Sequence, residues 1–196
     1  VKDNIDVAGL PTTAACPDYT YVAEEDAFVV NALRKAGALL IGKTNLDQFA
    51  TGLVGVRTPY PAPRNAIDPL VVPGGSSGGS AWRCGRRRRG QWVPAALNNI
   101  VGLKPTLGAL SASGVVPACR TLDTVSIFAL DVEDAWQVFR VACAHDAADS
   151  FSRPIAAPGL ASLPQKFSVG VPSKESIRFF GDDIQAQSFS AALRSI

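Results

Sequence analysis

The clearest pattern of apolar positions lies between residues 24 and 36, where they recur at the spacing of one helix face. Gly37 follows as a residue that commonly ends a helix. Residues 38–41 are all apolar, which is typical of a strand buried on both faces. Residues 1–7 favour a strand or a strand end, so the order strand, helix, strand predicts a βαβ unit of an α/β fold. The helical stripe consists of Val29, Val30, Leu33 and Ala36.

Further along the chain, the pattern predicts a second long helix and several short elements. Asp131 is placed to cap a helix over residues 132–144, whose apolar side chains again recur at helical spacing. Residues 57–73 contain five prolines and are expected to form a loop. Residues 150–164, rich in Pro, Ala and Ser, are expected to form a connector. The shorter expected elements are a turn at 10–13, a helix at 46–50, and strands or core segments at 99–103, 115–118, 125–130 and 167–171.

The composition is that of a folded domain. Hydrophobic residues make up 47% of the 196 residues, and charged residues make up 18%, below the ~25% of an average soluble domain. The length allows one ordinary domain or a part of a larger one, and we expect residues 1–196 to form a single, incomplete domain. No run of about 20 apolar residues is present, so we expect no membrane span.

The four cysteines are too scattered to form a recognisable site. They make no CxxC pair and no cluster with histidine, so we expect neither a metal site nor a cofactor. A chain of this length with so few cysteines does not resemble a disulfide scaffold, and free thiols are typical of the cytoplasm. The cysteines are Cys16, Cys84, Cys119 and Cys143.

The net charge of +2 comes from one short region. Five arginines lie between positions 83 and 89, and without them the chain would be mildly acidic. The overall charge therefore does not favour a nucleic-acid partner, and we expect none. A compact arginine run can nevertheless contact phosphates, which leaves nucleic-acid binding through residues 86–89 as an open alternative.

Residues 74–80 form an unbroken run of glycine and serine that follows Pro73 and lies between apolar segments. A flexible linker would not be expected there. The chain contains a single histidine, His145, so a Ser-His-Asp arrangement has little material to work with. A desolvated lysine can take the role of the base, because its neutral form accepts a proton from a hydroxyl group. The glycine-serine run together with Lys2 therefore points to a Lys-Ser hydrolase.

These segments resemble the amidase signature family. The resemblance runs through residues 1–4, 42–49, 74–81 and 101–106, in the order in which the family has them. It implies an α/β fold with a mixed, largely parallel sheet covered by helices, here incomplete. Residues 45–55 and 115–123 are most similar to allophanate hydrolase, often the amidase half of urea amidolyase, which converts allophanate to ammonia and carbon dioxide.

The resemblance implies a Ser-Ser-Lys mechanism, in which a bridging serine passes the proton of a nucleophilic serine to a buried lysine. The matching positions are Lys2 for the lysine and Ser76 for the bridging serine, and Lys2 must be neutral at rest. Other expected roles are substrate-binding ones at Gly74, Gly75, Ser77 and Arg120, with Arg120 contacting the carboxylate of allophanate. The alternatives are a structural serine at Ser77, a surface arginine at Arg120, a strand-end lysine at Lys104 and a solvated helix-end histidine at His145.

The resemblance also implies partners. A small amide is the expected substrate, a homodimer is the expected assembly, and a urea carboxylase, fused or separate, is the expected partner enzyme.

The resemblance breaks at residues 82–92, a short segment unlike either flank. The family carries its nucleophile within Ala-Gly-Ser-Gly-Arg-Val-Pro, and counting back from Pro94 puts Gly90 in the nucleophile's position and Trp92 in that of the arginine. Codons for the residues around Trp82 and around Gln91 can be read, one base out of frame, as Val-Ala-Val and Gly-Ser-Gly. The hypothesis is a frameshifted, partly deleted segment that loops into solvent, in a chain without amidase activity.

Two further interpretations stay open. The amidase component of a tRNA amidotransferase shares the lysine and the glycine-serine run, although the sequence from Pro117 to Arg120 argues against it. A non-catalytic binding module could also keep the scaffold without the chemistry.

Overall fold

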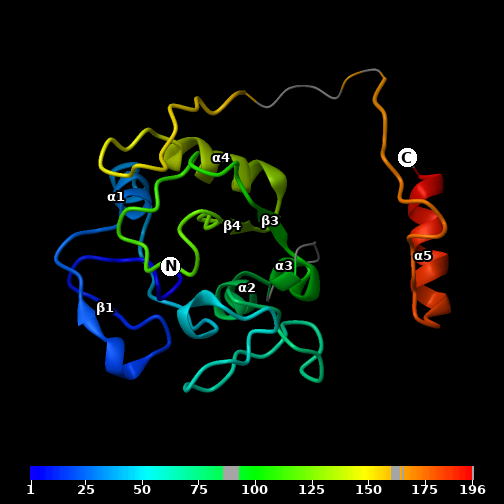
Figure 1. Cartoon of the computed structure of the whole chain (residues 1–196), viewed down its shortest axis with the longest axis horizontal. Coiled ribbons are helices and arrows are strands. Elements are labelled where there is room, and N and C mark those ends of the chain that lie inside the picture. The colour runs from blue at the N-terminus through cyan, green and yellow to red at the C-terminus, as the bar shows by residue number, and fades with distance from the viewer. Residues whose placement is uncertain (86–92, 160–163, 165, 196) are drawn as a thin grey trace. The chain divides into compact units, whose positions relative to one another are not determined.

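The computed structural model describes residues 1–85, 93–159, 164 and 166–195 (Figure 1). The chain divides into two compact units, Val1–Leu160 and Ala161–Ile196, which are treated separately. The first unit contains β1 (Pro11–Thr12), η1 (Pro17–Tyr19), β2 (Tyr21–Val22), α1 (Phe28–Lys35), η2 (Gln48–Ala50), α2 (Gly78–Gly85), α3 (Val93–Asn98), β3 (Val101–Leu103), β4 (Ile127–Ala129) and α4 (Val132–Ala142). The second contains α5 (Asp183–Arg194).

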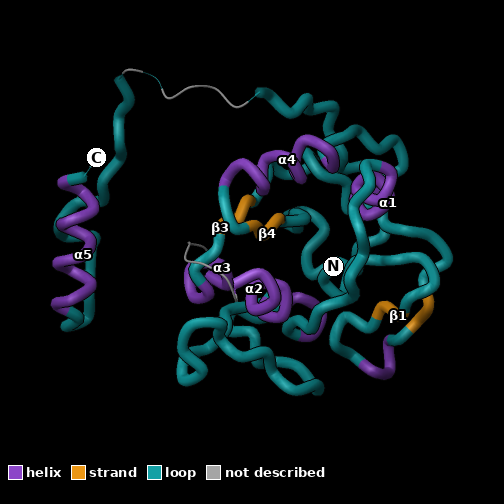
Figure 2. Tube along the Cα trace, turned by 180° about the vertical axis from the view of Figure 1, so that it is seen from behind, coloured by secondary structure: helices purple, strands orange, loops and turns teal. Residues whose placement is uncertain are grey.

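A two-stranded sheet of β3 and β4 lies between helices. The strands are antiparallel, with Val101 opposite Ala129. Helix α4 contacts both strands, whereas α2 contacts β4 and α3 contacts β3. Figures 1 and 2 show α4 on one side of this pair and α2 with α3 on the other. Successive side chains of a strand point to opposite faces, so Ile127 packs with the α4 side while Phe128 packs with Ala81 of α2. Helices therefore cover both faces of the strands, as in an α/β layer structure.

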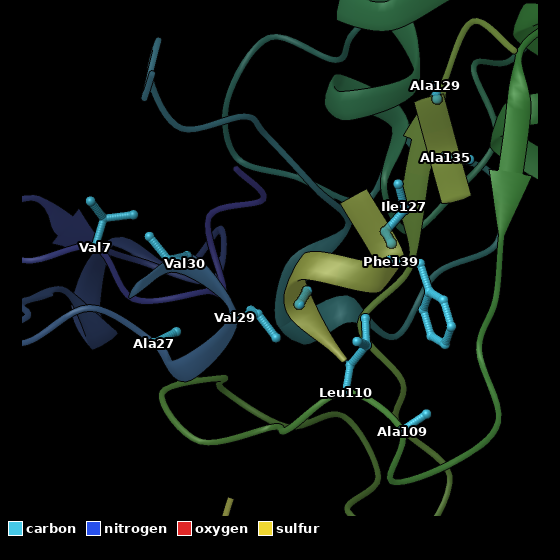
Figure 3. Packing of buried hydrophobic residues seen from close by; sticks show 11 residues of the cluster. Val7, Ala27, Val29, Val30, Ala109, Leu110, Ile127, Ala129, Ala135 and Phe139 are labelled. Atoms are coloured by element: carbon cyan, nitrogen blue, oxygen red, sulfur yellow. The ribbon is translucent and has the colours of Figure 1, made fainter. Parts of the chain in front are cut away.

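The larger core lies between α1, α4 and β4. Figure 3 shows Val29 of α1, Ile127 of β4 and Phe139 of α4 in this cluster, together with Leu110 from the loop after β3. The predicted apolar stripe of α1 is therefore confirmed as the buried face, since Val29 and Val30 are its buried residues. Gly37, with a φ of 93°, follows the helix in the left-handed conformation that glycine adopts readily. Helix α1 begins at Phe28, later than the sequence predicts.

Helix α4 follows its sequence prediction closely. Asp131 caps it, because its carboxylate accepts a hydrogen bond of 2.8 Å from the main-chain N–H of Asp134. Ala135 and Phe139 of this helix are buried against the strands. His145 lies just beyond the helix and is exposed, as expected for a solvated histidine.

Replacing Asp131 by alanine is expected to lower the free energy of unfolding by about 1 kcal/mol, since the N–H of Asp134 loses its acceptor at the helix end. Urea denaturation followed by circular dichroism measures the change. Asp131→Asn keeps an acceptor oxygen and should recover most of the loss. An unchanged midpoint for Asp131→Ala would contradict the capping role.

The predicted βαβ unit is present in a reduced form. Lys2 and Thr44 form a parallel bridge on either side of α1, and the N–H of Thr44 donates to the carbonyl of Val1 at 2.8 Å. An ion pair of 3.1 Å between Lys43 and Asp3 joins the same two segments. Pairing thus occurs at 42–44, and the prediction of a buried strand at 38–41 is wrong: Leu39 is 90% exposed and Ile41 86% exposed. The burial of an apolar run depends on neighbouring segments, which a sequence pattern does not supply.

Other short elements differ from the expectations. Residues 10–13 are not a simple turn, because β1 pairs with β2 antiparallel. Residues 115–118 contribute only one bridge, from Val115 to Ile5, and residues 167–171 form no strand. Helix α5, which the pattern did not predict, is capped by Asp182, whose carboxylate accepts from the N–H of Gln185. The loop at 57–73 and the strands within 99–103 and 125–130 are confirmed.

Within the described ranges, none of the helices combines the length and hydrophobicity that crossing a bilayer requires.

Candidate active site

The structure brings Lys2 and Ser76 together although 74 positions separate them in sequence. Lys2 Nζ donates a hydrogen bond of 2.7 Å to Ser76 Oγ. Both side chains are partly buried. The peptide bond between Gly75 and Ser76 is cis. A lysine amine in direct contact with a serine hydroxyl is the arrangement in which either group can take a proton from the other.

The electrostatic setting of Lys2 favours its neutral form. Burial lowers the pKa of Lys2 to about 8, because the ammonium group loses hydration there. The carboxylates of Asp123 and Asp47 oppose this shift without cancelling it. The amine therefore reaches its uncharged form near neutral pH far more readily than an exposed lysine, which retains its proton up to about pH 10.

A buried carboxylate, Asp47, holds the glycine-serine run in place. Its side chain is fully buried and accepts hydrogen bonds from the main-chain N–H groups of Gly55 at 3.0 Å and Arg57 at 2.7 Å. Its own N–H donates to the carbonyl of Ser76 at 3.0 Å. The N–H of Gly75 donates to the carbonyl of Leu53. One aspartate thus ties the loop after η2 to the residue that contacts Lys2.

Two glycines of the run are required by close approaches. Gly74 has a φ of 80°, and a side chain there would lie 2.7 Å from the backbone of Pro94. A Cβ on Gly75 would lie 2.0 Å from Asp47 Oδ2. Real Cβ atoms do not approach so closely, so both positions need the missing side chain of glycine. The expected role of these glycines in shaping the site is thereby given a geometric basis, while their contact with a substrate stays a prediction.

A cavity of about 640 Å³ opens beside the Lys2–Ser76 pair. Its wall is apolar over much of its extent, with a few polar side chains. Gly75 and Ser77 line it, as the sequence prediction of a substrate-binding loop requires. Arg120 is exposed and is not among the lining residues, so the structure does not bring it to the pair. Its contact with a carboxylate stays a prediction. The polar side chains in the wall are Lys2, Asn4, Thr44, Ser76, Ser77, Ser80, Arg83, Asp123, Thr124 and Ser126.

Sequence reasoning missed the roles of several residues at this site. Asp47 and Thr44 lie inside the motifs that carry the family resemblance, but nothing in a single sequence marks Asp47 as the buried anchor. Thr44 Oγ1 and Ser80 Oγ lie 2.6 Å apart and join the parallel bridge to α2. Asp123 lines the cavity while Oδ2 accepts from the N–H groups of Ala118 and Cys119.

The remaining predicted positions are less informative. Lys104 directly follows β3 and donates to the carbonyl of Pro105, as expected of a strand-end residue. Gly90, Trp92 and the arginines at 86–89 lie outside the described residues. Of the unusual segment, residues 82–85 belong to α2, so the expectation that the whole of it loops away from the fold is wrong for its first four residues. The described residues include no group of three or more side chains able to hold a metal ion.

The chain matches the family model for amidase over residues 1–87 and 92–194. It is 47% identical to urea amidolyase of Saccharomyces cerevisiae over 207 residues, which covers all of this chain and 11% of the yeast protein. It is also 38% identical to the A-type component of glutamyl-tRNA(Gln) amidotransferase from Heliobacterium modesticaldum, covering 95% of this chain and 41% of that protein.

Among solved structures, a serine-to-alanine variant of allophanate hydrolase from Kluyveromyces lactis superimposes with a TM-score of 0.90 at 46% identity. The match covers 99% of this chain and 33% of the other, so the chain spans about a third of that enzyme. The α/β fold class expected from the sequence is confirmed by this likeness. The two main parts of the family match flank the segment that departs from the pattern. With its fold, its motifs and a match along nearly the whole chain, this protein belongs to the amidase family.

Proposed function

We propose that the Lys2–Ser76 pair is the proton relay of a Ser-Ser-Lys amide hydrolase whose substrate is allophanate. The observation that carries the proposal is the 2.7 Å contact between Lys2 Nζ and Ser76 Oγ, in a place where burial lowers the pKa of the lysine to about 8. A neutral amine there can accept the proton of Ser76 while Ser76 accepts that of an attacking hydroxyl group. Similarity to urea amidolyase and allophanate hydrolase supports the choice of substrate.

In the complete reaction, a nucleophilic serine adds to the amide carbonyl as its proton moves to Ser76 and the proton of Ser76 moves to Lys2. The C–N bond then breaks, the nitrogen receives the proton back along the same path, and ammonia leaves. Water repeats the cycle on the acyl-enzyme and frees the acid. Allophanate gives two ammonia molecules and carbon dioxide once the resulting carbamates decompose.

This chain lacks the residue that begins the reaction. Gly90 stands where the family resemblance requires the nucleophilic serine, and no serine occurs between Ser80 and Ser111. The interruption of the family match at 88–91, and an alignment to the yeast relative that runs over 207 residues for a chain of 196, support the loss of a segment. The lost segment would also carry oxyanion donors, each worth about 3 kcal/mol in the transition state. We therefore propose that the chain, as its sequence stands, does not hydrolyse allophanate.

Transplanting residues 81–92 of this chain into the corresponding place of the Saccharomyces cerevisiae relative is expected to reduce ammonia release from allophanate by at least about 1,000-fold, as loss of a nucleophile does. A coupled ammonia assay measures the rate. As a matched control, residues 132–143 of this chain, which contain α4, should leave the rate within about tenfold. Retained activity in the 81–92 chimera, or ammonia release by the present chain, would overturn the proposal of inactivity.

The frameshift origin of the segment has a separate test. Genomic DNA between the codons of Ala81 and Pro94 should read as Val-Ala-Val and Gly-Ser-Gly in neighbouring frames. Codons that give neither would exclude it.

The second candidate is the ammonia-producing component of a tRNA amidotransferase, supported by relatives such as the Heliobacterium protein. A chimera with a restored nucleophile segment separates the two, since an amidotransferase component would release ammonia from glutamine rather than from allophanate. Urea amidolyase as a relative further supports a urea carboxylase as partner enzyme.

A further inference from the structure

Two buried polar atoms belong to side chains that line the cavity and have no hydrogen-bond partner among the described residues. They are Asn4 Oδ1 and Thr124 Oγ1. A buried polar group without a partner destabilises a protein by about 1–3 kcal/mol, so most such groups in folded proteins are paired. Two of them in the wall of one cavity point to a ligand that provides the missing bonds.

The orientation of the Asn4 amide is fixed by its other contacts. Its Nδ2 donates to the carbonyl of Val116 at 2.9 Å, and the N–H of Val116 donates to the main-chain carbonyl of Asn4 at 2.8 Å. Because the nitrogen end is occupied, the unpaired atom is an acceptor. Asn4 is only 6% exposed. It therefore presents an immobile oxygen that requires an N–H or O–H from whatever fills the cavity.

Both residues stand next to the groups that set the state of Lys2. Asn4 lies in the tight turn from Lys2 to Ile5, closed by a 3.0 Å bond between the N–H of Ile5 and the carbonyl of Lys2. Thr124 directly follows Asp123, whose carboxylate acts on the charge of Lys2. Much of the remaining wall is apolar, as in small-molecule sites where a few polar groups fix the orientation of the ligand. Apolar lining residues are Val29, Leu110, Val125, Ile127, Phe128 and Val138.

We propose that Asn4 and Thr124 form a subsite for the uncharged amide or ureido group of the substrate. Asn4 Oδ1 accepts a substrate N–H, and the Thr124 hydroxyl donates to a carbonyl oxygen. The neighbouring Asp123 carboxylate and the Asn4 oxygen both repel a carboxylate, so the subsite selects the neutral end of the ligand. This subsite deepens the proposed function and depends on it for the identity of the substrate, although binding itself requires no turnover.

The test is binding of malonamide to this chain, followed by NMR titration, with dimethyl malonate as a ligand that keeps both carbonyl groups but lacks N–H. Thr124→Val keeps the shape of the side chain and removes the hydroxyl. It is expected to weaken malonamide binding about three- to tenfold, the effect of one hydrogen bond, while leaving the melting temperature unchanged or raised. Thr51→Val, which removes an exposed hydroxyl outside the cavity lining, is the matched control and should bind malonamide like the unaltered chain.

Asn4→Leu is expected to remove the preference for malonamide over dimethyl malonate. If that variant does not fold, Thr124→Val decides by itself. Equal malonamide affinity in Thr124→Val and the unaltered chain, a lowered melting temperature in that variant, or no binding to the unaltered chain would each overturn the subsite. The chimera that tests the proposed function measures ammonia, so its failure leaves these affinity comparisons intact and the two proposals fail separately.

Discussion

Replacing Asp47 by alanine is expected to lower the free energy of unfolding by about 4 kcal/mol, more than any other change considered. The carboxylate is fully buried and accepts hydrogen bonds from the N–H groups of Gly55 and Arg57. Its removal leaves two main-chain donors without their acceptors, each at a cost of about 1–3 kcal/mol. It also leaves a void against Gly52 and Gly75, which pack closely on the carboxylate.

Urea denaturation at neutral pH measures this loss. Asp18→Ala is the matched control, because Asp18 is exposed and a surface change of this kind stays within about 0.5 kcal/mol. Asp47→Asn should fall between the two, since one oxygen remains to accept while the new amide N–H group faces a donor. A loss below about 1 kcal/mol for Asp47→Ala would mean that the loop carrying Ser76 is held by other contacts.

Replacing Lys2 by methionine is expected to raise the free energy of unfolding by about 2 kcal/mol at pH 7. Burial lowers the pKa of Lys2 from 10.5 to about 8, so the charged lysine costs the folded chain roughly 3 kcal/mol below pH 8. Methionine fills a similar volume without the charge. Loss of the hydrogen bond to Ser76 offsets about 1 kcal/mol of the gain.

The pH dependence distinguishes this effect from a simple packing change. Between pH 8 and 10.5 the unfolded chain binds more protons at Lys2 than the folded chain does, so the stability of the unaltered chain rises with pH over this range. The advantage of methionine should therefore fade across the same range and reverse slightly at pH 11. Lys35→Met, at an exposed position of α1, is the control and should show little effect at either pH. A pH-independent difference for Lys2→Met would contradict the lowered pKa.

The sequence alone predicted the elements whose signals are local. Helices α1 and α4 followed from apolar residues at helical spacing, and the Asp131 cap followed from one residue type at one position. The proline-rich loop was equally plain. Strand positions were predicted less well, because pairing is decided by distant segments: residues 38–41 are largely uncovered while 42–44 pair with the chain's first residues.

The candidate site divides in the same way. The motifs were sufficient to name Lys2 and Ser76 and to identify the family, because these residue types are tied to a chemistry that needs them. Only the tertiary structure decided that the two side chains touch, that burial lowers the pKa of the lysine, that Asp47 holds the loop, and that Asn4 and Thr124 line the cavity without partners among the described residues. Distances, burial and unsatisfied hydrogen bonds arise from segments brought together by folding, and one-dimensional spacing carries no direct record of them.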